Sequence, residues 1–213
     1  MTIHATDVDS PDDEHEPLGC FPVALKLTAK RCLLIGSARE TAGRARSLLE
    51  AGADLRILSE APDDELRALV FARRLSFEQR TWEERDVLDC WLVVMTDQNP
   101  EAAARLGCIC DEQRIFFCAV DDPEPSSFSH VAIARAGALW AAIGTAGKAP
   151  ALASRMRQEL QRIFDESHLT DLVKRFAELR VNTSRSERRA VLLRAAARVS
   201  ILGRIIEGTD DAP

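Results

Sequence analysis

Histidine is scarce in this chain, and no apolar run is long enough to span a bilayer. Only four of the 213 residues are histidines, and two of them, His4 and His15, lie in an acidic N-terminal segment. That segment, residues 1–19, lacks the basic start and apolar stretch of a secretory signal peptide. The net charge of −6 argues against general nucleic-acid binding. We therefore expect a cytoplasmic protein that binds neither membranes nor nucleic acids.

The six cysteines fit the same compartment, because without a secretion signal they are expected to be free and mostly buried. Hydrophobic residues make up 46% of the chain and charged residues 29%, as in an ordinary globular protein. The charge is uneven, since arginines are dense between Arg155 and Arg204. This half of the chain would suit a small molecule that carries many carboxylates.

Strand-like and helix-like segments alternate over the first two-thirds of the chain. The apolar patterns predict strands over residues 32–35, 55–58, 75–79, 91–95 and 115–120, and helices over residues 39–51, 63–72 and 100–112. Repeated β-α-β order is typical of a parallel sheet with helices on both faces. The sequence therefore predicts an α/β fold with a Rossmann-like parallel sheet in its N-terminal domain.

The pattern changes after Pro125. Two extended segments are predicted over residues 127–134 and 138–143, and a long helix begins at Pro150. Further amphipathic helices are predicted over residues 171–179 and 186–206. The C-terminal third is thus helical and forms a separate layer or small domain.

The first strand ends at Gly36, and the helix that follows has the layout of a dinucleotide-binding turn. The glycine pattern is incomplete, because Ala38 stands where a second glycine would let a pyrophosphate approach the backbone. Ser37 and Arg39 could help to bind the phosphates, and Glu60 after the second strand could accept hydrogen bonds from the ribose hydroxyls. A plain βα turn, with Glu60 as a surface charge, explains the same residues.

Asp121 follows a buried strand, at the edge of the sheet where ligands gather in open parallel folds. Its carboxylate could act as a general base or bind a cation, or it could cap the turn before Pro123. His130, nine residues later, could face a metal or could be a packed or surface side chain. The pair Cys108 and Cys110 is an improbable metal site, because residues two apart on a helix face different ways.

The loop before Pro150 is a second possible anion site, because the helix N-terminus carries partial positive charge. Thr145 would offer a hydroxyl there and Lys148 a cation. A tight connection into the helical layer is the simpler interpretation of this loop. Arg155 and the arginines after it could bind substrate carboxylates or could be solvated helix faces.

Together these segments resemble the precorrin-2 dehydrogenase/sirohydrochlorin ferrochelatase family of siroheme synthesis. The similarity begins with a strand-like opening, Phe21-Pro22-Val23, followed by Leu25 and Leu27. It continues through the segments Leu48-Leu-Glu-Ala-Gly-Ala53, Leu88-Asp-Cys-Trp-Leu-Val-Val94, Thr96-Asp97, Arg114-Ile-Phe116, Val120-Asp121, Ser127-Phe128 and Ala149-Pro150. The order and spacing of these segments are more specific than any one of them, and they cover residues 21–206.

The resemblance implies a homodimer that oxidises precorrin-2 to sirohydrochlorin with NAD, inserts ferrous iron as a substrate metal, or does both. It divides the chain into an acidic disordered tail (1–19), a nucleotide-binding domain (20–125), a dimerisation region (126–164) and a helical C-terminal domain (165–213). Asp121 matches the family's essential aspartate and would accept protons and lie near the metal. The resemblance places NAD against Gly36, Ser37, Ala38, Arg39, Glu60 and Thr96, and the tetrapyrrole against Thr145, Lys148, Arg155 and His130.

The chain departs from the family around the expected NAD site. The usual glycine-rich turn is replaced by Gly36-Ser-Ala-Arg-Glu-Thr41, in which Thr41 is bulkier than the usual alanine. Cys118 replaces an asparagine near the end of the last strand, and Ala103 replaces another in the helix after Asp97. Three alternatives therefore stay open: a chelatase without dehydrogenase activity, a non-catalytic tetrapyrrole- or nucleotide-binding protein, and a Rossmann-type sensor unrelated to tetrapyrroles.

Overall fold

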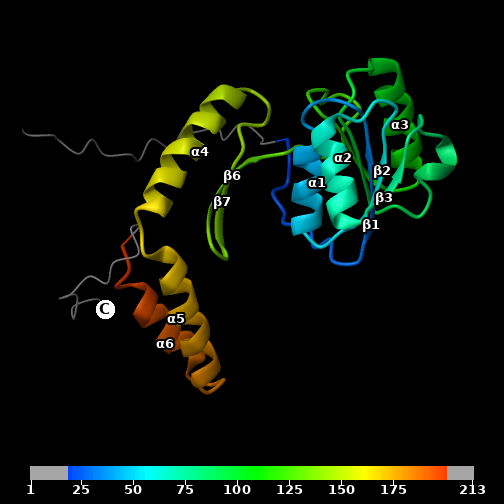
Figure 1. Ribbon diagram of the computed structural model, residues 1–213. Coiled ribbons are helices and arrows are strands. Elements are labelled where there is room, and N and C mark those ends of the chain that lie inside the picture. The colour runs from blue at the N-terminus through cyan, green and yellow to red at the C-terminus, as the bar shows by residue number, and fades with distance from the viewer. Residues whose placement is uncertain (1–18, 201–213) are drawn as a thin grey trace, which may run out of the picture.

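The computed structural model describes residues 19–200 and contains an α/β domain joined to an elongated hairpin-and-helix region (Figure 1). The expected acidic tail and the end of the chain, residues 201–213, lie outside the described residues. Five parallel strands form one sheet in the order β3-β2-β1-β4-β5. Their bounds are β1 Arg31–Ile35, β2 Asp54–Leu58, β3 Ser76–Glu78, β4 Leu92–Met95 and β5 Phe116–Ala119. This confirms the Rossmann-like fold class.

Helices cover both faces of this sheet, as the alternating pattern predicts. Helices α1 (Thr41–Glu50) and α2 (Asp64–Arg73) pack on one face, where Leu34, Ile57 and Val94 are buried. Helix α3 (Pro100–Glu112) packs on the other face, over Leu33 and Val93. Central strands buried on both faces are nearly continuous apolar runs, which is why their positions could be predicted.

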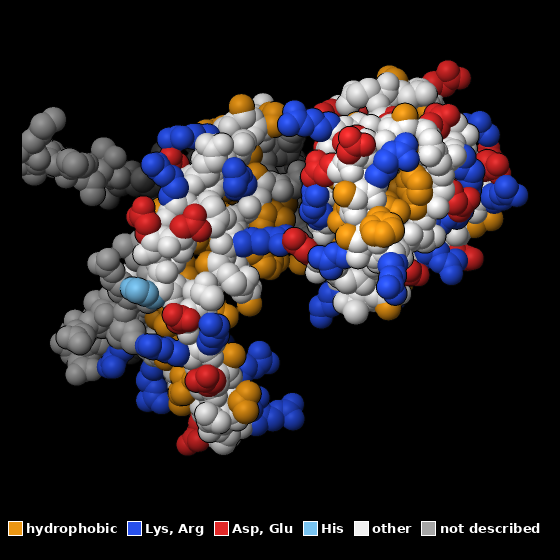
Figure 2. Space-filling view, viewed as in Figure 1, with side chains coloured by type: hydrophobic (Ala, Val, Ile, Leu, Met, Phe, Trp, Pro, Cys, Tyr) orange, Lys and Arg blue, Asp and Glu red, His pale blue; other side chains and the backbone are white. Residues whose placement is uncertain are grey.

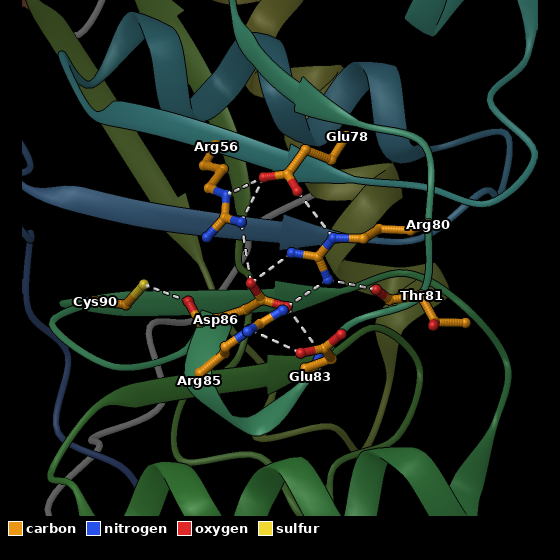
Figure 3. Close-up of polar contacts among 8 residues, drawn as sticks. All are labelled: Arg56, Glu78, Arg80, Thr81, Glu83, Arg85, Asp86 and Cys90. Atoms are coloured by element: carbon orange, nitrogen blue, oxygen red, sulfur yellow. Dashed lines mark hydrogen bonds and ion pairs between the residues drawn. The ribbon is translucent and has the colours of Figure 1, made fainter.

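A cluster of charged side chains fastens the edge strand β3 to the rest of the sheet (Figure 3). Its centre is Asp86, whose side chain is 2% exposed, in the 3₁₀ turn Glu84–Asp86. Asp86 accepts hydrogen bonds from Arg80 at 2.7 and 2.8 Å and from Arg56 of β2 at 3.0 Å. Glu78 at the end of β3 pairs with the same two arginines. Charge pairing thus replaces the apolar packing that the short, half-apolar β3 lacks.

The strand-like opening expected over residues 21–27 is wrong. This segment pairs with no strand, and its first apolar side chain, Phe21, is 86% exposed. Pro22 cannot donate a backbone hydrogen bond. Only Leu27 is buried in the core beside α1.

The strand predicted over residues 127–134 begins later, as β6 (Ala132–Ala136). The reason lies in two serine hydroxyls that bond to the backbone of β5 and hold the chain in a turn. Ser126 Oγ accepts from Ala119 N at 3.0 Å, and Ser127 Oγ accepts from Phe117 N at 2.9 Å. Serine side chains that bond locally to the backbone compete with strand pairing in this way.

Strand β6 forms an antiparallel hairpin with β7 (Leu139–Ile143), and α4 (Pro150–Asp165) packs against it. An ion pair of 2.9 Å between Arg135 of β6 and Glu50 of α1 links the hairpin to the α/β domain. Two helices follow, α5 (Leu169–Asn182) and α6 (Arg188–Ala196). The helix expected over residues 186–206 is α6, which ends at Ala196 and buries none of its residues, while residues 201–206 lie outside the described part of the chain. A helix without a buried face gains little stability from tertiary packing.

All six cysteines are free, and four of them are buried, as expected. Burial raises the pKa of Cys32 to about 11 and that of Cys110 to about 12, so these thiols are unreactive. Among residues 19–200, no helix is both long and apolar enough to cross a bilayer.

Candidate functional site

The carboxyl ends of four parallel strands bring the predicted nucleotide and acid–base residues to one edge of the sheet. Gly36 and Ser37 follow β1, Glu60 lies two residues beyond β2, and Thr96 and Asp121 follow β4 and β5. The strand order reverses between β1 and β4. Ligands bind at this switch point in open α/β sheets, because the loops on its two sides diverge and leave a crevice.

Gly36 is required by the packing of the turn. Its φ is +139°, and a Cβ added there would lie 2.1 Å from Thr96 Oγ1 and 3.0 Å from the backbone nitrogen of Asp97. The loop after β4 therefore rests directly on the backbone of Gly36. This contact explains the glycine without a ligand, so the glycine alone is no evidence for a phosphate site.

Thr96 supports the turn from beneath. Its side chain is fully buried, and its hydroxyl lies 2.7 Å from Thr41 Oγ1 and donates to the carbonyl of Ile35 at 3.3 Å. The bulk of Thr41 is accommodated because its hydroxyl pairs with that of Thr96. Thr96 thus positions the turn and is shielded from any ligand in the crevice.

Ser37 has its polar groups engaged within the protein. Its backbone N–H donates to Asp97 Oδ1 at 2.6 Å. Its hydroxyl lies 2.9 Å from Ser59 Oγ and accepts from Ala61 N at 3.1 Å. Sequence reasoning missed Asp97 as a site residue. The available signal was its position, two residues after a buried strand at the same edge as Gly36.

The other predicted nucleotide contacts are open to solvent or half-buried. Arg39 and Glu60 are exposed, and the carbonyl of Ala38 accepts from Thr41 N at 2.9 Å. Arg39 also lines a shallow depression of about 310 Å³ on the outer face of α1, shared with Arg44 and Glu65. The Arg39 side chain is therefore available to an anion that approaches the start of α1.

Asp121 is held with its carboxylate in solvent by a tight turn. Its φ is +62°, an uncommon conformation for a residue other than glycine, and the residue is exposed. Ser126 secures the turn, because its hydroxyl donates to the carbonyl of Asp122 at 2.7 Å. An outward carboxylate at the end of a strand is available to take a proton from a bound molecule.

His130 lies close to the buried end of β5. Its Nδ1 is 3.7 Å from Cys118 Sγ, and its ring stacks on Phe128 with centroids 5.5 Å apart. His130 is an exposed residue, yet loss of water around its ring, with a smaller effect from the charge of Arg44, lowers its pKa to about 4. The imidazole is therefore neutral at pH 7. In residues 19–200, no three His, Cys, Asp or Glu side chains are grouped as a metal site.

The remaining predicted substrate residues lie at the start of α4, apart from the sheet in Figure 1. Thr145 Oγ1 accepts from Ala149 N at 3.1 Å, so this hydroxyl stabilises the turn into α4. Lys148 is exposed, and Arg155 forms an ion pair of 2.5 Å with Glu159 on the helix surface. The structure therefore brings together the residues of the sheet edge and leaves these three in α4 and in the loop before it.

Comparison with known proteins places this geometry in a family. A family model described as "Putative NAD(P)-binding" matches residues 23–132. A siroheme synthase from Gluconobacter oxydans is 32% identical over 167 residues, which are 76% of this chain and 34% of that protein. Siroheme synthase 1 from Aeromonas salmonicida is 34% identical over 68% of this chain and 31% of its own length. The chain thus spans about a third of the curated relatives it matches.

A solved structure titled "SirC, precorrin-2 dehydrogenase" has the same fold. Its TM-score is 0.66 at 21% identity, over 82% of this chain and 88% of that one. Both the sheet and the elements after it contribute to that coverage. The chain belongs to the putative NAD(P)-binding family of the precorrin-2 dehydrogenase/sirohydrochlorin ferrochelatase type found in siroheme synthases.

Proposed function

We propose that this chain is an enzyme of siroheme biosynthesis that acts on precorrin-2 or sirohydrochlorin. Its reaction is the NAD-dependent oxidation of precorrin-2, the insertion of ferrous iron into sirohydrochlorin, or both. The observation that carries the proposal is the exposed carboxylate of Asp121, held by a tight turn at the carboxyl edge of the sheet in a chain of this family. We place the reaction in the cytoplasm, which the six free thiols support.

Asp121 suits both reactions because each one releases protons. Oxidation of the macrocycle removes a hydride together with a proton, and a carboxylate can accept that proton. Metal insertion displaces two pyrrole protons as the ferrous ion enters the ring. In both cases Asp121 acts as the general base, and in the second its negative charge also lies near the incoming metal.

The fold supports NAD as a ligand, but the turn after β1 does not fit a pyrophosphate as it stands. The N–H of Ser37 would be the first donor to a phosphate and is already bonded to the carboxylate of Asp97. Ala38 also carries a Cβ on this turn. These two observations favour the alternative of a chelatase, or a tetrapyrrole-binding protein, that has lost the dehydrogenase step.

The substrate-binding residues are proposed on charge. The substrates that the family resemblance implies, precorrin-2 and sirohydrochlorin, carry eight carboxylates. Lys148 and Arg155 are cations on the exposed surface of the α4 region. The ion pair between Arg155 and Glu159 is solvent-exposed and therefore weak, so a substrate carboxylate can replace Glu159. Thr145 and His130 complete the proposed set through a hydroxyl and a neutral imidazole.

Thermal unfolding with separate ligands tests the proposed function. Sirohydrochlorin at about 100 times its dissociation constant should stabilise the native state by about 2.7 kcal/mol, and the melting temperature should rise. A rise with NAD⁺ as well would indicate the bifunctional enzyme, whereas a rise with sirohydrochlorin alone would indicate the chelatase or the binding protein. Absorbance changes on adding ferrous iron then separate those two. No response to sirohydrochlorin would contradict the proposal.

We also propose that the protein is a homodimer joined through residues 126–164. The face of the β6–β7 hairpin that α4 leaves open carries Trp140, 50% exposed, and Ile133, 36% exposed, beside Arg135, which lies opposite Trp140 and pairs with Glu50 of α1; Val131, just before β6, is 42% exposed. Figure 2 shows hydrophobic side chains along the hairpin, on the side toward the α/β domain. A two-stranded sheet with exposed apolar side chains is marginal in water, and within residues 19–200 no third strand joins it. A second copy of the chain would cover this face.

Sedimentation velocity tests the dimer. The wild-type chain should sediment as a dimer, and Trp140→Glu should shift it toward monomer by at least about tenfold in dissociation constant, since it places a charge in an apolar contact. Phe71→Glu is the matched control, because Phe71 is an exposed aromatic residue on α2 in the other domain. A monomeric wild type, or an equal effect of the two substitutions, would refute the interface.

A further inference from the structure

Arg44 of α1 is a half-buried cation to which the fold gives no counter-ion. The other half-buried arginines of the α/β domain, Arg56 and Arg80, both bond to Asp86. Between residues 19 and 200, Arg44 forms neither an ion pair nor a side-chain hydrogen bond. A guanidinium that loses part of its water without an anionic partner costs free energy. An anionic ligand at Arg44 would offset that cost.

The acidic residues around the adjacent depression leave Arg44 unpaired. Glu40 lies four residues before it, the spacing at which ion pairs form on a helix, yet within the described residues the two form none. Glu65 borders the same depression of about 310 Å³ and pairs with Arg46 at 2.6 Å. The depression therefore gives a dissolved anion access to Arg44.

Arg44 also lies near the end of β5 that precedes Asp121. Loss of water raises the pKa of Cys118 and lowers that of His130, and the positive charge of Arg44 has a further effect on each. The negative charge of Asp121 acts on the same Cys118 thiol. Charges have such effects on groups that are close to them, and the two groups themselves are in contact, with His130 Nδ1 3.7 Å from Cys118 Sγ. An unpaired guanidinium and an exposed carboxylate thus share this end of β5.

From this placement we propose that Arg44 binds a carboxylate at the rim of the tetrapyrrole and orients the macrocycle toward Asp121. The inference rests on the proposed function. The carboxylates of the substrate lie at the rim and the protons that leave come from the ring, so an anchor beside the general base holds the reacting atoms in its reach. Two parallel N–H groups of a guanidinium can bind one carboxylate, which fixes its direction as well as its position. Arg44 is thus a substrate-binding residue, and proton transfer remains with Asp121.

Fluorescence titration of the full chain with sirohydrochlorin tests this role. Arg44→Met keeps the apolar stem and removes the charge, so the dissociation constant should rise about tenfold or more, the usual loss for a charged hydrogen bond. Arg44→Lys keeps the charge without the planar fork and should bind with intermediate affinity. Arg46→Met is the matched control, because Arg46 borders the same depression and already pairs with Glu65, and it should bind as the wild type does. The affinity for NAD⁺ should be the same in Arg44→Met and the wild type.

Thermal unfolding without ligand separates a binding role from a structural one. Because Arg44 has no counter-ion in the described protein, Arg44→Met should melt at or above the temperature of the wild type. A structural arginine would instead lower the melting temperature when it is removed. A loss of substrate affinity without a loss of stability is therefore the expected combination.

Four results would overturn the proposal: unchanged sirohydrochlorin affinity in Arg44→Met, an equal loss in Arg46→Met, an equal or larger loss of NAD⁺ affinity, or a lower melting temperature of ligand-free Arg44→Met. The third would assign Arg44 to the dinucleotide, and the fourth would make it structural. In all four the wild type still binds sirohydrochlorin, so the proposed function stands. A wild type that does not bind sirohydrochlorin would refute the proposed function and the role of Arg44 together.

Discussion

Asp121→Asn should lower the rate of tetrapyrrole turnover by on the order of 10²–10⁴-fold, which is the usual contribution of a general base. Asparagine has nearly the shape of aspartate and tolerates the left-handed backbone conformation at this position, where φ is +62°. It cannot accept the proton that the macrocycle must lose. Because the side chain is exposed, the substitution should leave the melting temperature within about a degree of the wild type. Steady-state kinetics and thermal unfolding on the same preparation measure both effects.

Asp122→Asn provides the control, since it removes the adjacent carboxylate from the same turn. Asp122 holds the turn through its backbone carbonyl, which accepts from Ser126, and this bond survives the substitution. Most of the activity should therefore remain. Equal losses in the two variants would mean that negative charge in general, and not the Asp121 carboxylate, supports the reaction. Full activity of Asp121→Asn would remove Asp121 from the mechanism.

The sheet could be predicted because its central strands have few alternatives. The central strands are buried on both faces of the sheet, through Leu34 and Val94 on one face and Leu33 and Val93 on the other. Each of these strands is therefore a short apolar run between turns. The opening segment could not be placed in the same way. Its apolar residues resemble a strand in sequence, but whether Phe21 is buried depends on contacts that its own sequence does not specify.

The candidate site was predictable in position and only partly in detail. Parallel topology alone brings Gly36 and Asp121 to one edge of the sheet. The bonds that decide what the edge can bind are long-range, since Ser37 and Asp97 are 60 residues apart, and Thr41 and Thr96 are 55 apart. A single sequence shows both threonines and the aspartate but carries no sign that they meet. The inward position of Thr96, which the sequence placed against the cofactor, follows from those contacts.

Asp86→Ala should lower the free energy of unfolding at pH 7 by about 3–5 kcal/mol, the usual cost of removing one partner from a buried ion pair. The Asp86 side chain is 2% exposed and accepts two hydrogen bonds from Arg80, as Figure 3 shows. A further bond of 2.8 Å comes from the backbone nitrogen of Glu83. Loss of the Asp86 carboxylate leaves the two partly buried guanidinium groups of Arg56 and Arg80 with Glu78 as their remaining acidic partner. Urea denaturation at pH 7 measures the change.

Glu78→Gln is the matched control for Asp86. Glu78 bonds to the same two arginines, but its side chain is 45% exposed, so water replaces much of what the pair provides. An exposed ion pair contributes at most about 1 kcal/mol, and the loss should be correspondingly smaller. Equal losses in the two variants would show that burial of Asp86 is not what fastens β3 to the sheet.

The fall of the unfolding free energy at acidic pH gives an independent test of the same cluster. The hydrogen bonds from Arg80, aided by the N–H of Glu83, lower the pKa of Asp86 from 3.8 to about 2 in the folded protein. The unfolded chain therefore binds the proton more readily, so the contribution of Asp86 is complete above pH 4 and is lost as the pH falls toward 2. Asp86→Asn should flatten the fall in unfolding free energy between pH 4 and pH 2. Because hydrogen bonds to the same arginines also lower the pKa of Glu78, the slope should diminish without vanishing. An unchanged slope in Asp86→Asn would mean that the carboxylate is not ionised against Arg80 in the native state.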